Sequence, residues 1–399
     1  MPVASLVSGV SSAAARWADP SFPARRRLSE AVSQRTRYSV PVVEHAFDAL
    51  FGSLRRDAIE AVIADELGCL NVLDDFSNRP GRPRARALPL GKIAIVSSRT
   101  TIGVAIVPAV FALCAKCAVH VKDREDSLVA AFFETVREEL PHLAGSLSAE
   151  EWDWEVESDR LSGYDGVVAF GNDHTLSRVA RELPPLTRFI GFGSKASAGY
   201  ITREARENEE DVHAFAARVA RDVVLYDTEG CLSLHVLFVE PHERFPIERF
   251  SQFVADAVAA MARELPVSDR DAQARARQAL ARDAATFALS PQVVQSDPDS
   301  SFLVLTDSSG ERPPPFVARS VVICEVDSPA QAARYLHRHG ISLEGLAIAQ
   351  RRHDLIETAL QLGVSRITEL GMLQRPPLGY FHGGRPRIAE FVRWVSDET

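Results

Sequence analysis

Between residues 91 and 193 the sequence repeats one pattern: a short β-branched and apolar run, a loop, and then an apolar segment with helical spacing. The strand-like runs are residues 92–96, 118–122, 165–170 and 188–192, and the intervening helical segments are residues 104–115, 127–140 and 175–183. Successive strand–helix–strand units imply parallel strands joined by right-handed crossovers, with a ligand at the carboxyl ends of the strands. The pattern predicts an α/β, Rossmann-type nucleotide-binding lobe, although no G-x-G-x-x-G motif is present.

A chain of 399 residues with 46% hydrophobic residues is too long for one ordinary core, so we expect two lobes and a terminal extension. The predicted parts are an N-terminal helical extension with a linker (1–88), a cofactor-binding domain (89–224), a catalytic domain (225–370), and a C-terminal tail that packs back on the body (371–399).

Several local expectations refine this division. Residues 41–67 have helical spacing with a break near Gly52, and residues 74–89 are rich in Pro, Gly and Arg and indicate a linker. Arg25, Arg26 and Arg27 form a charge run expected in solvent. Residues 193–199 are expected to be a loop, and residues 388–395 a helix.

Composition excludes several classes of protein. A net charge of −9 argues against nucleic acid or an anionic membrane surface as the partner. No apolar run reaches the length of a membrane span. The five cysteines are sparse and odd in number, which favours a reducing, cytoplasmic setting. Of the 45 basic residues only four are lysines, at positions 92, 116, 122 and 195. Two interpretations stay open: a rare lysine marks a site that needs a compact ammonium, or the four fall together by chance.

The most informative single residue is Cys231. A turn-prone Asp-Thr-Glu-Gly segment delivers it to the start of a strand-like run at 235–239. Gly230 permits close approach of a ligand, and the N–H groups of Cys231 and Leu232 could stabilise a developing anion. On local sequence alone, a small buried hydrophobe is the commoner outcome for such a cysteine.

Other candidate groups carry weaker signals. Strand alternation would put His235 on the same face as Cys231, where it is either an acid–base partner or a histidine bonded to the backbone. His382, in a glycine-rich tail, is a second candidate acid or base. The pair Cys114 and Cys117 has C-x-x-C spacing but no second pair, which favours packing. The eleven histidines show no metal-binding spacing, so we predict no metal.

Five segments together resemble one family, the acyl-CoA reductases typified by the LuxC-type fatty-acid reductase of bacterial bioluminescence, within the aldehyde dehydrogenase-like superfamily. The segments are residues 118–122 (AVHVK), 167–173 (VVAFGND), 188–193 (RFIGFG), 231–240 (CLSLHVLFVE) and 373–384 (LQRPPLGYFHGG). The resemblance extends from about residue 39 to 394. It implies an aldehyde dehydrogenase-like fold, with a Rossmann-type cofactor lobe and an α/β catalytic lobe.

The resemblance further implies NADPH-dependent reduction of an acyl thioester, carried by CoA or an acyl-carrier protein, to an aldehyde. Cys231 would form the acyl-enzyme. Lys122 would reach the cofactor ribose or its 2′-phosphate, and Gly171, Asn172 and Asp173 would lie near the phosphates. Gly193 would pass close to the nicotinamide. The family also implies a partner that loads the acyl group, and we expect a homo-oligomer.

Two features depart from the family pattern. Arg99, followed by Thr100, stands nearest to the position of an asparagine that could hold the oxyanion, and the residue after Ser233 is Leu234 where the family has proline. The hydrolytic glutamate of aldehyde dehydrogenases has no counterpart in residues 189–195. Two alternatives therefore remain open: an acyltransferase that uses Cys231, and a non-catalytic nucleotide-binding homologue.

Overall fold

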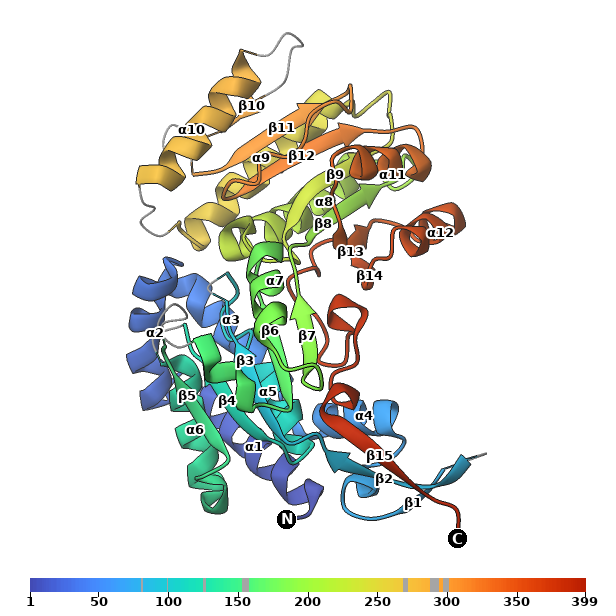
Figure 1. The fold of residues 1–399 in the computed structure, drawn as a ribbon. Coiled ribbons are helices and arrows are strands. Elements are labelled where there is room, and N and C mark those ends of the chain that lie inside the picture. The colour runs from blue at the N-terminus through green and yellow to red at the C-terminus, as the bar shows by residue number, and fades with distance from the viewer. Residues whose placement is uncertain are drawn as a thin grey trace. The chain divides into compact units, whose positions relative to one another are not determined.

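The computed structural model describes residues 1–79, 82–98, 100–124, 127–152, 158–267, 272–287, 294–296 and 301–399 (Figure 1). The chain forms two compact units. Unit 1 comprises residues 1–36, 43–194 and 377–399, and unit 2 comprises residues 37–42 and 195–376.

Unit 1 contains a five-stranded parallel sheet with the order β5-β4-β3-β6-β7. Its strands are β3 (Lys92–Val96), β4 (Ala118–Lys122), β5 (Leu147–Glu150), β6 (Gly166–Phe170) and β7 (Arg188–Phe192). The predicted parallel α/β arrangement is confirmed, and β5 is an additional strand. The chain runs from β3 outward to β5 and then continues on the other side of β3, so the carboxyl ends of β3 and β6 flank a topological switch point.

The helices of unit 1 are α1 (Val3–Ala18), α2 (Pro23–Thr36), α4 (Arg56–Leu67), α5 (Ile106–Cys114), α6 (Leu128–Glu139) and α7 (Asp173–Glu182), while α3 (Val40–Ser53) begins in the short unit 2 segment. Helix α1 packs against α5 and α6 and buries Val7, Val10 and Trp17. The N-terminal helices are thus part of the packed body of unit 1, because α1 presents a continuous apolar face to it.

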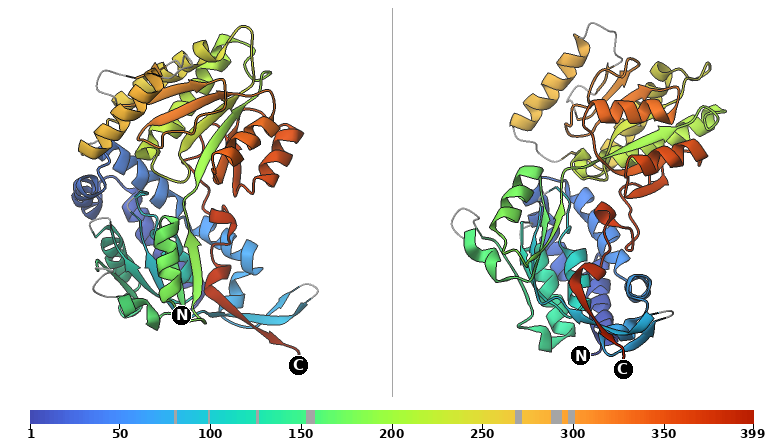
Figure 2. Two further views of the ribbon diagram at one scale, coloured as in Figure 1. Left: turned by 45° about the horizontal axis from the view of Figure 1, so that its top comes forward. Right: turned by 45° about the vertical axis from the view of Figure 1, so that its right-hand side comes forward.

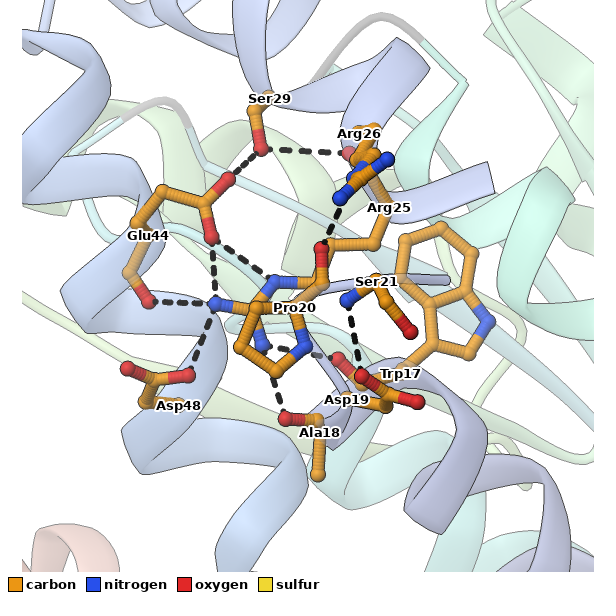
Figure 3. Close-up of polar contacts among 10 residues, drawn as sticks. All are labelled: Trp17, Ala18, Asp19, Pro20, Ser21, Arg25, Arg26, Ser29, Glu44 and Asp48. Atoms are coloured by element: carbon orange, nitrogen blue, oxygen red, sulfur yellow. Dashed lines mark hydrogen bonds and ion pairs between the residues drawn. The ribbon is translucent and has the colours of Figure 1, made fainter. Parts of the chain in front are cut away.

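Arg25 corrects the expectation of a solvated charge run. Its side chain is only 1% exposed, whereas Arg26 and Arg27 are exposed. Figure 3 shows its guanidinium donating to the carbonyl oxygens of Trp17 and Ala18 and to the carboxylates of Glu44 and Asp48. A charge can be buried in this way because nearly all of its donors have partners.

A three-stranded antiparallel sheet corrects two further expectations. Strands β1 (Ser77–Arg79) and β2 (Arg82–Pro89) occupy most of the predicted linker, and β15 (Val392–Asp397) occupies the second half of the predicted C-terminal helix. Both views in Figure 2 show β2 and β15 side by side in an arm that projects from unit 1. Pairing between residues about 300 positions apart gives both segments the backbone partners that local sequence does not supply.

Unit 2 contains a seven-stranded sheet with the order β10-β11-β12-β9-β8-β13-β14, parallel except for the β10–β11 pair. The strands are β8 (Ala196–Ile201), β9 (Leu234–Val239), β10 (Val294–Gln295), β11 (Leu303–Asp307), β12 (Ser320–Glu325), β13 (Leu343–Ile348) and β14 (Arg366–Glu369). Residues 196–199, expected in a loop, belong to β8. Because β8 pairs with β9 and β13, the boundary between the units falls at 194/195 and not at the expected 224/225.

Helices cover both faces of this sheet (Figure 1). They are α8 (Glu209–Val224), α9 (Ile247–Glu264), α10 (Ala272–Thr286), α11 (Pro329–Arg338) and α12 (His353–Gln361). One core joins α8 and α9 to the sheet, and the other joins α11 and α12 to its opposite face. This layering leaves the loops at the two ends of the strands to carry chemistry.

Candidate active site

A strained turn delivers Cys231 to the amino end of β9. Tyr226, Asp227 and Thr228 have φ values of 56°, 50° and 57°, so three consecutive non-glycine residues are left-handed. Asp227 forms an ion pair of 2.5 Å with Arg319, whose side chain is fully buried. The Thr228 hydroxyl donates a hydrogen bond to the carbonyl oxygen of Val317. Such conformations cost energy and cluster at functional sites. The expected turn is present, but its rigidity comes from Arg319.

Neighbouring strands fix the backbone on both sides of the cysteine. The Ser197 hydroxyl, in β8, donates to the carbonyl oxygen of Cys231 at 2.9 Å. Ser233 accepts a hydrogen bond from the Gln374 side chain at 2.9 Å, and its carbonyl oxygen accepts from the backbone N–H of Ser197. The thiol therefore sits on a loop whose position is set by β8 and by the segment after β14.

Two β-bulges lie at the level of Ser197. In β9, Leu234 pairs with Ser197 and Val236 with Ala198, which leaves His235 as the extra residue. In β13, Leu343 pairs with Ala196 and Gly345 with Ser197, which leaves Glu344 as the extra residue. Bulges bend a strand and redirect side chains, and they recur beside active sites. The simple alternation that would put His235 on the face of Cys231 is therefore interrupted.

The surroundings of the Cys231 sulfur favour the protonated thiol. The residue is half-buried. Removal from water, with a further contribution from the Glu344 carboxylate, raises the pKa of Cys231 to about 12. Hydrogen bonds from the N–H groups of Cys231 and Leu232, together with the Lys195 ammonium, act in the opposite direction. That these two N–H groups face a developing anion stays a prediction.

His235 is buried and packs against Phe316, with ring centroids 4.9 Å apart. Burial lowers the pKa of His235 to about 4, so the ring is neutral at neutral pH. Its Nδ1 atom has no hydrogen-bond partner among the described residues. An acid–base role for His235 remains a prediction.

In unit 1, the expected phosphate-binding residues gather where β6 and β7 end. Asn172 caps α7 by accepting from the backbone N–H of Thr175 at 2.8 Å. A Cβ atom added to Gly171 would lie 3.0 Å from the Thr175 side chain, and one added to Gly193 would lie 3.0 Å from the Asp173 carboxylate. A side chain at either glycine would therefore press on Thr175 or Asp173 at this helix end. Asp173 adds a negative charge there, so its proximity to phosphates stays a prediction.

Lys122 and the loop after β3 lie at the same edge of the sheet. Lys122 ends β4, is largely buried, and places its ammonium 5.4 Å from the centre of the Trp152 ring. Thr100 is exposed, and its hydroxyl lies 3.2 Å from that of Ser98. Arg99, the predicted oxyanion residue, lies outside the described residues.

His382 belongs to unit 1, whereas Cys231 belongs to unit 2. The imidazole stacks on Phe192 with ring centroids 4.4 Å apart, and Phe192 stacks on Phe170 at 4.9 Å. This aromatic stack covers the ends of β6 and β7, beside the glycines described above. The C-terminal tail therefore contributes to the cofactor lobe, and a catalytic role for His382 stays a prediction.

The remaining candidates are structural. Cys114 and Cys117 are free and buried, and the Cys117 thiol donates to the carbonyl oxygen of Phe391, which agrees with the packing interpretation. Within the described ranges, no group of three or more His, Cys, Asp and Glu residues is arranged to hold a metal ion. None of the described helices is both long and apolar enough to cross a membrane.

Sequence reasoning missed three groups that surround the nucleophile candidate: Glu344, Ser197 and Gln374. Glu344 had a usable signal, because it is a lone carboxylate within the apolar run 343–348. Ser197 had none, since its relation to Cys231 depends on strand pairing between distant segments. Gln374 lies in a segment that marks the family, but that segment gave no sign of its hydrogen bond to Ser233.

Comparison with known proteins finds similarity to acyl-CoA reductases. Residues 1–394 match the family described as acyl-CoA reductase (LuxC). The long-chain acyl-protein thioester reductase 2 of Photobacterium leiognathi is 22% identical over 353 residues, which cover 86% of this chain and 71% of the relative. The long-chain acyl-protein thioester reductase of Photorhabdus luminescens is 22% identical over 396 residues, covering 96% of this chain and 79% of the relative.

Solved structures show the same fold. An NAD-dependent benzaldehyde dehydrogenase from Corynebacterium glutamicum superposes with a TM-score of 0.74 at 15% identity, covering 100% of this chain and 86% of that chain. A glyceraldehyde-3-phosphate dehydrogenase from Methanocaldococcus jannaschii, complexed with NADP, gives a TM-score of 0.72 at 10% identity, covering 100% and 90%. The predicted aldehyde dehydrogenase-like fold is confirmed.

Proposed function

Because the chain belongs to the acyl-CoA reductase (LuxC) family, we propose that it reduces an acyl thioester to an aldehyde through an acyl-Cys231 intermediate. The carrier is CoA or an acyl-carrier protein. Two relatives are named long-chain acyl-protein thioester reductases, which favours a long acyl chain on a protein thiol. A partner that loads the acyl group and a homo-oligomeric state belong to the same proposal.

The chemistry starts at the Cys231 sulfur. The thiolate attacks the thioester carbonyl carbon, a new carbon–sulfur bond forms, and the bond to the carrier sulfur breaks. The carrier leaves as a thiol after taking up a proton. The N–H groups of Cys231 and Leu232, whose hydrogen bonds lower the pKa of the Cys231 thiol, are suited to the oxyanion that develops on the carbon bonded to that sulfur.

NADPH is the proposed reductant, and it supplies hydride to the acyl group when bound. The residues at the carboxyl end of the unit 1 sheet fit a dinucleotide. Lys122 offers a largely buried cation for the adenosine ribose or its phosphate, and Gly171 and Gly193 follow the carboxyl ends of β6 and β7, where a dinucleotide binds in this type of sheet. The absence of a carboxylate in residues 189–195 suits an enzyme that does not hydrolyse its acyl-enzyme.

One observation carries the proposal. Cys231 follows three left-handed residues whose conformation is maintained by the buried Asp227–Arg319 pair. A cysteine that only fills space needs no strained support, whereas a nucleophile must be held in one position for attack.

The test is the intact mass of the protein after incubation with a long-chain acyl-CoA or acyl-carrier protein, followed by NADPH. The wild type should gain one acyl group and release it as aldehyde. Cys231→Ser should give no thioester adduct and lose at least about a thousandfold of the reductase rate, as for loss of a covalent nucleophile. The matched control is Cys69→Ser, which removes another half-buried thiol.

Each outcome separates the alternatives. An adduct that persists with NADPH would favour acyl transfer, and an adduct retained in Cys231→Ser would exclude this residue as the nucleophile. No adduct with either donor would leave a nucleotide-binding homologue.

A further inference from the structure

Glu344 is an unusual residue for the middle of a packed sheet. Its side chain is 1% exposed, and it occupies the bulge of β13 between the buried residues Leu343 and Leu346. A carboxylate removed from water needs a compensating charge and hydrogen bonds. The bulge turns Glu344 out of the regular alternation, so that Leu343 and Leu346 share one core while the carboxylate goes elsewhere.

The compensating charge is Lys195. Its ammonium lies 3.0 Å from a Glu344 carboxylate oxygen and 3.4 Å from the Ser365 hydroxyl, which also donates to that oxygen at 3.3 Å. The Lys195 side chain is 29% exposed. Lys195 is one of the chain's four lysines, and a compact ammonium suits a position with two close acceptors.

The same strands connect this pair to Cys231. Ser197, two residues after Lys195, donates to the Cys231 carbonyl oxygen and accepts at 3.1 Å from the backbone N–H of Gly345, the neighbour of Glu344. A single hydroxyl thus links β13, β8 and the cysteine loop. These two hydrogen bonds fix the backbone of Cys231 and the backbone next to Glu344 to the strand that follows Lys195.

The charges of the pair act on the Cys231 sulfur with opposite sign. Among the charges that act on the pKa of Cys231, that of Glu344, from β13, raises it and that of Lys195, which precedes β8, lowers it. The backbone N–H groups of Cys231 and Leu232 also lower it. Lys195 therefore supplies a cationic side chain that favours the thiolate.

We propose that Lys195 is the cation that stabilises the Cys231 thiolate during acyl capture, and that Glu344 and Ser365 are positioning residues that hold its ammonium. The inference rests on the proposed function, since it assigns the electrostatic partner of the same nucleophile. The S–H bond of Cys231 breaks to give the thiolate, the thiolate sulfur bonds to the carbonyl carbon, the bond from that carbon to the carrier sulfur breaks, and the proton ends on the departing carrier sulfur. No external oxidant or reductant takes part in this step.

The test measures the thiol directly, without acyl substrate. The alkylation rate of Cys231 by iodoacetamide is followed between pH 7 and 10 by mass spectrometry of the peptide that contains it. Lys195→Met should lower the rate at each pH about tenfold, which corresponds to one pKa unit. Glu344→Gln should raise it, because the opposing charge is removed while the amide retains the shape of the side chain. Lys195→Arg should restore most of the wild-type rate.

The opposite signs distinguish electrostatics from structure. If the ion pair only supports the fold, both neutral variants should change the rate in the same direction, and that result would overturn the proposal, as would no change in either. Ser365→Ala is a milder variant that keeps both charges, and a decrease of about twofold to threefold is expected from a less fixed ammonium. If Lys195→Met does not fold, Glu344→Gln and Ser365→Ala still test the proposal, because the first should raise the alkylation rate and the second should lower it.

The readout is independent of the reductase proposal. If the wild type forms no acyl adduct but Lys195→Met still lowers the alkylation rate and Glu344→Gln still raises it, the proposed function is contradicted. The electrostatic role of Lys195 then still holds. If the wild type does form the adduct and Lys195→Met forms it equally fast, the role of Lys195 is contradicted while the proposed function stands.

Discussion

At the scale of single residues, burial changes the chemistry of two neighbours on one chain segment. The Cys231 sulfur and the His235 ring both lose contact with water, so each favours its neutral form. The pair at neutral pH is a thiol and an uncharged imidazole. A thiolate–imidazolium pair of the kind found in cysteine proteases would need a different environment, which is why the charge of Lys195 matters.

His235 also makes stability depend on pH. Its pKa is about 4 in the folded protein, below the ordinary value of 6.5, so the unfolded chain binds the extra proton more readily. The stabilisation is present above pH 6.5 and is lost as the pH falls toward 4. Between pH 7.5 and 5.0 this residue should account for about 2 kcal/mol of the loss in unfolding free energy.

Urea unfolding of the wild type and of His235→Leu at the two pH values checks this expectation. The loss in unfolding free energy between pH 7.5 and 5.0 should be smaller in the variant by that amount. His174→Gln is the matched control, since His174 is exposed in the folded protein. An equal loss in wild type and His235→Leu would show that the ring is not held neutral.

At the scale of elements, the N-terminal helices depend on a buried cation. Arg25, in α2, ties the end of α1 to α3 through two carbonyl oxygens and two carboxylates, and Ser29 contacts the same Glu44 (Figure 3). No propensity argument would place an arginine there, because its neighbours in the triplet are exposed. The contacts that decide its burial come from α1 and α3.

Arg25→Leu should destabilise the protein by about 3–5 kcal/mol, since it leaves carbonyl and carboxylate groups without their cation. Arg27→Leu changes the same residue type two positions away, on the exposed side of α2, and should alter stability by less than about 0.5 kcal/mol. Thermal unfolding compares the two. Similar losses for both variants would contradict the burial of Arg25.

At the scale of the whole molecule, the chain crosses between its units more than once. Unit 2 takes in residues 37–42, where the Tyr38 hydroxyl donates to the carbonyl oxygen of Tyr226, and unit 1 regains the chain from residue 377 onward. The unit boundary at 194/195 gives β8 to unit 2, where it lies between β9, which follows Cys231, and β13, which contains Glu344.

Two fragments test this boundary. Residues 195–376 contain every strand of the seven-stranded sheet and should unfold cooperatively in urea. Residues 225–376 lack β8 and α8, which splits the sheet between β9 and β13, and should not form a cooperative fold. Equal behaviour of the two fragments would contradict the assignment of β8, and far-ultraviolet circular dichroism gives an independent check.

The amino-acid sequence by itself determined the parallel sheet of unit 1, the cysteine at the entrance to β9 and the segments that mark the family. These features rest on local periodicity and on residues close together in the chain, so a reader of the sequence can find them. Only the tertiary structure decided that 82–89 and 392–397 are paired strands, that Arg25 is buried, and that Lys195 and Glu344 share the surroundings of Cys231. Each of these depends on partners far away in sequence, and the free energy of pairing and desolvation exists only once those partners meet.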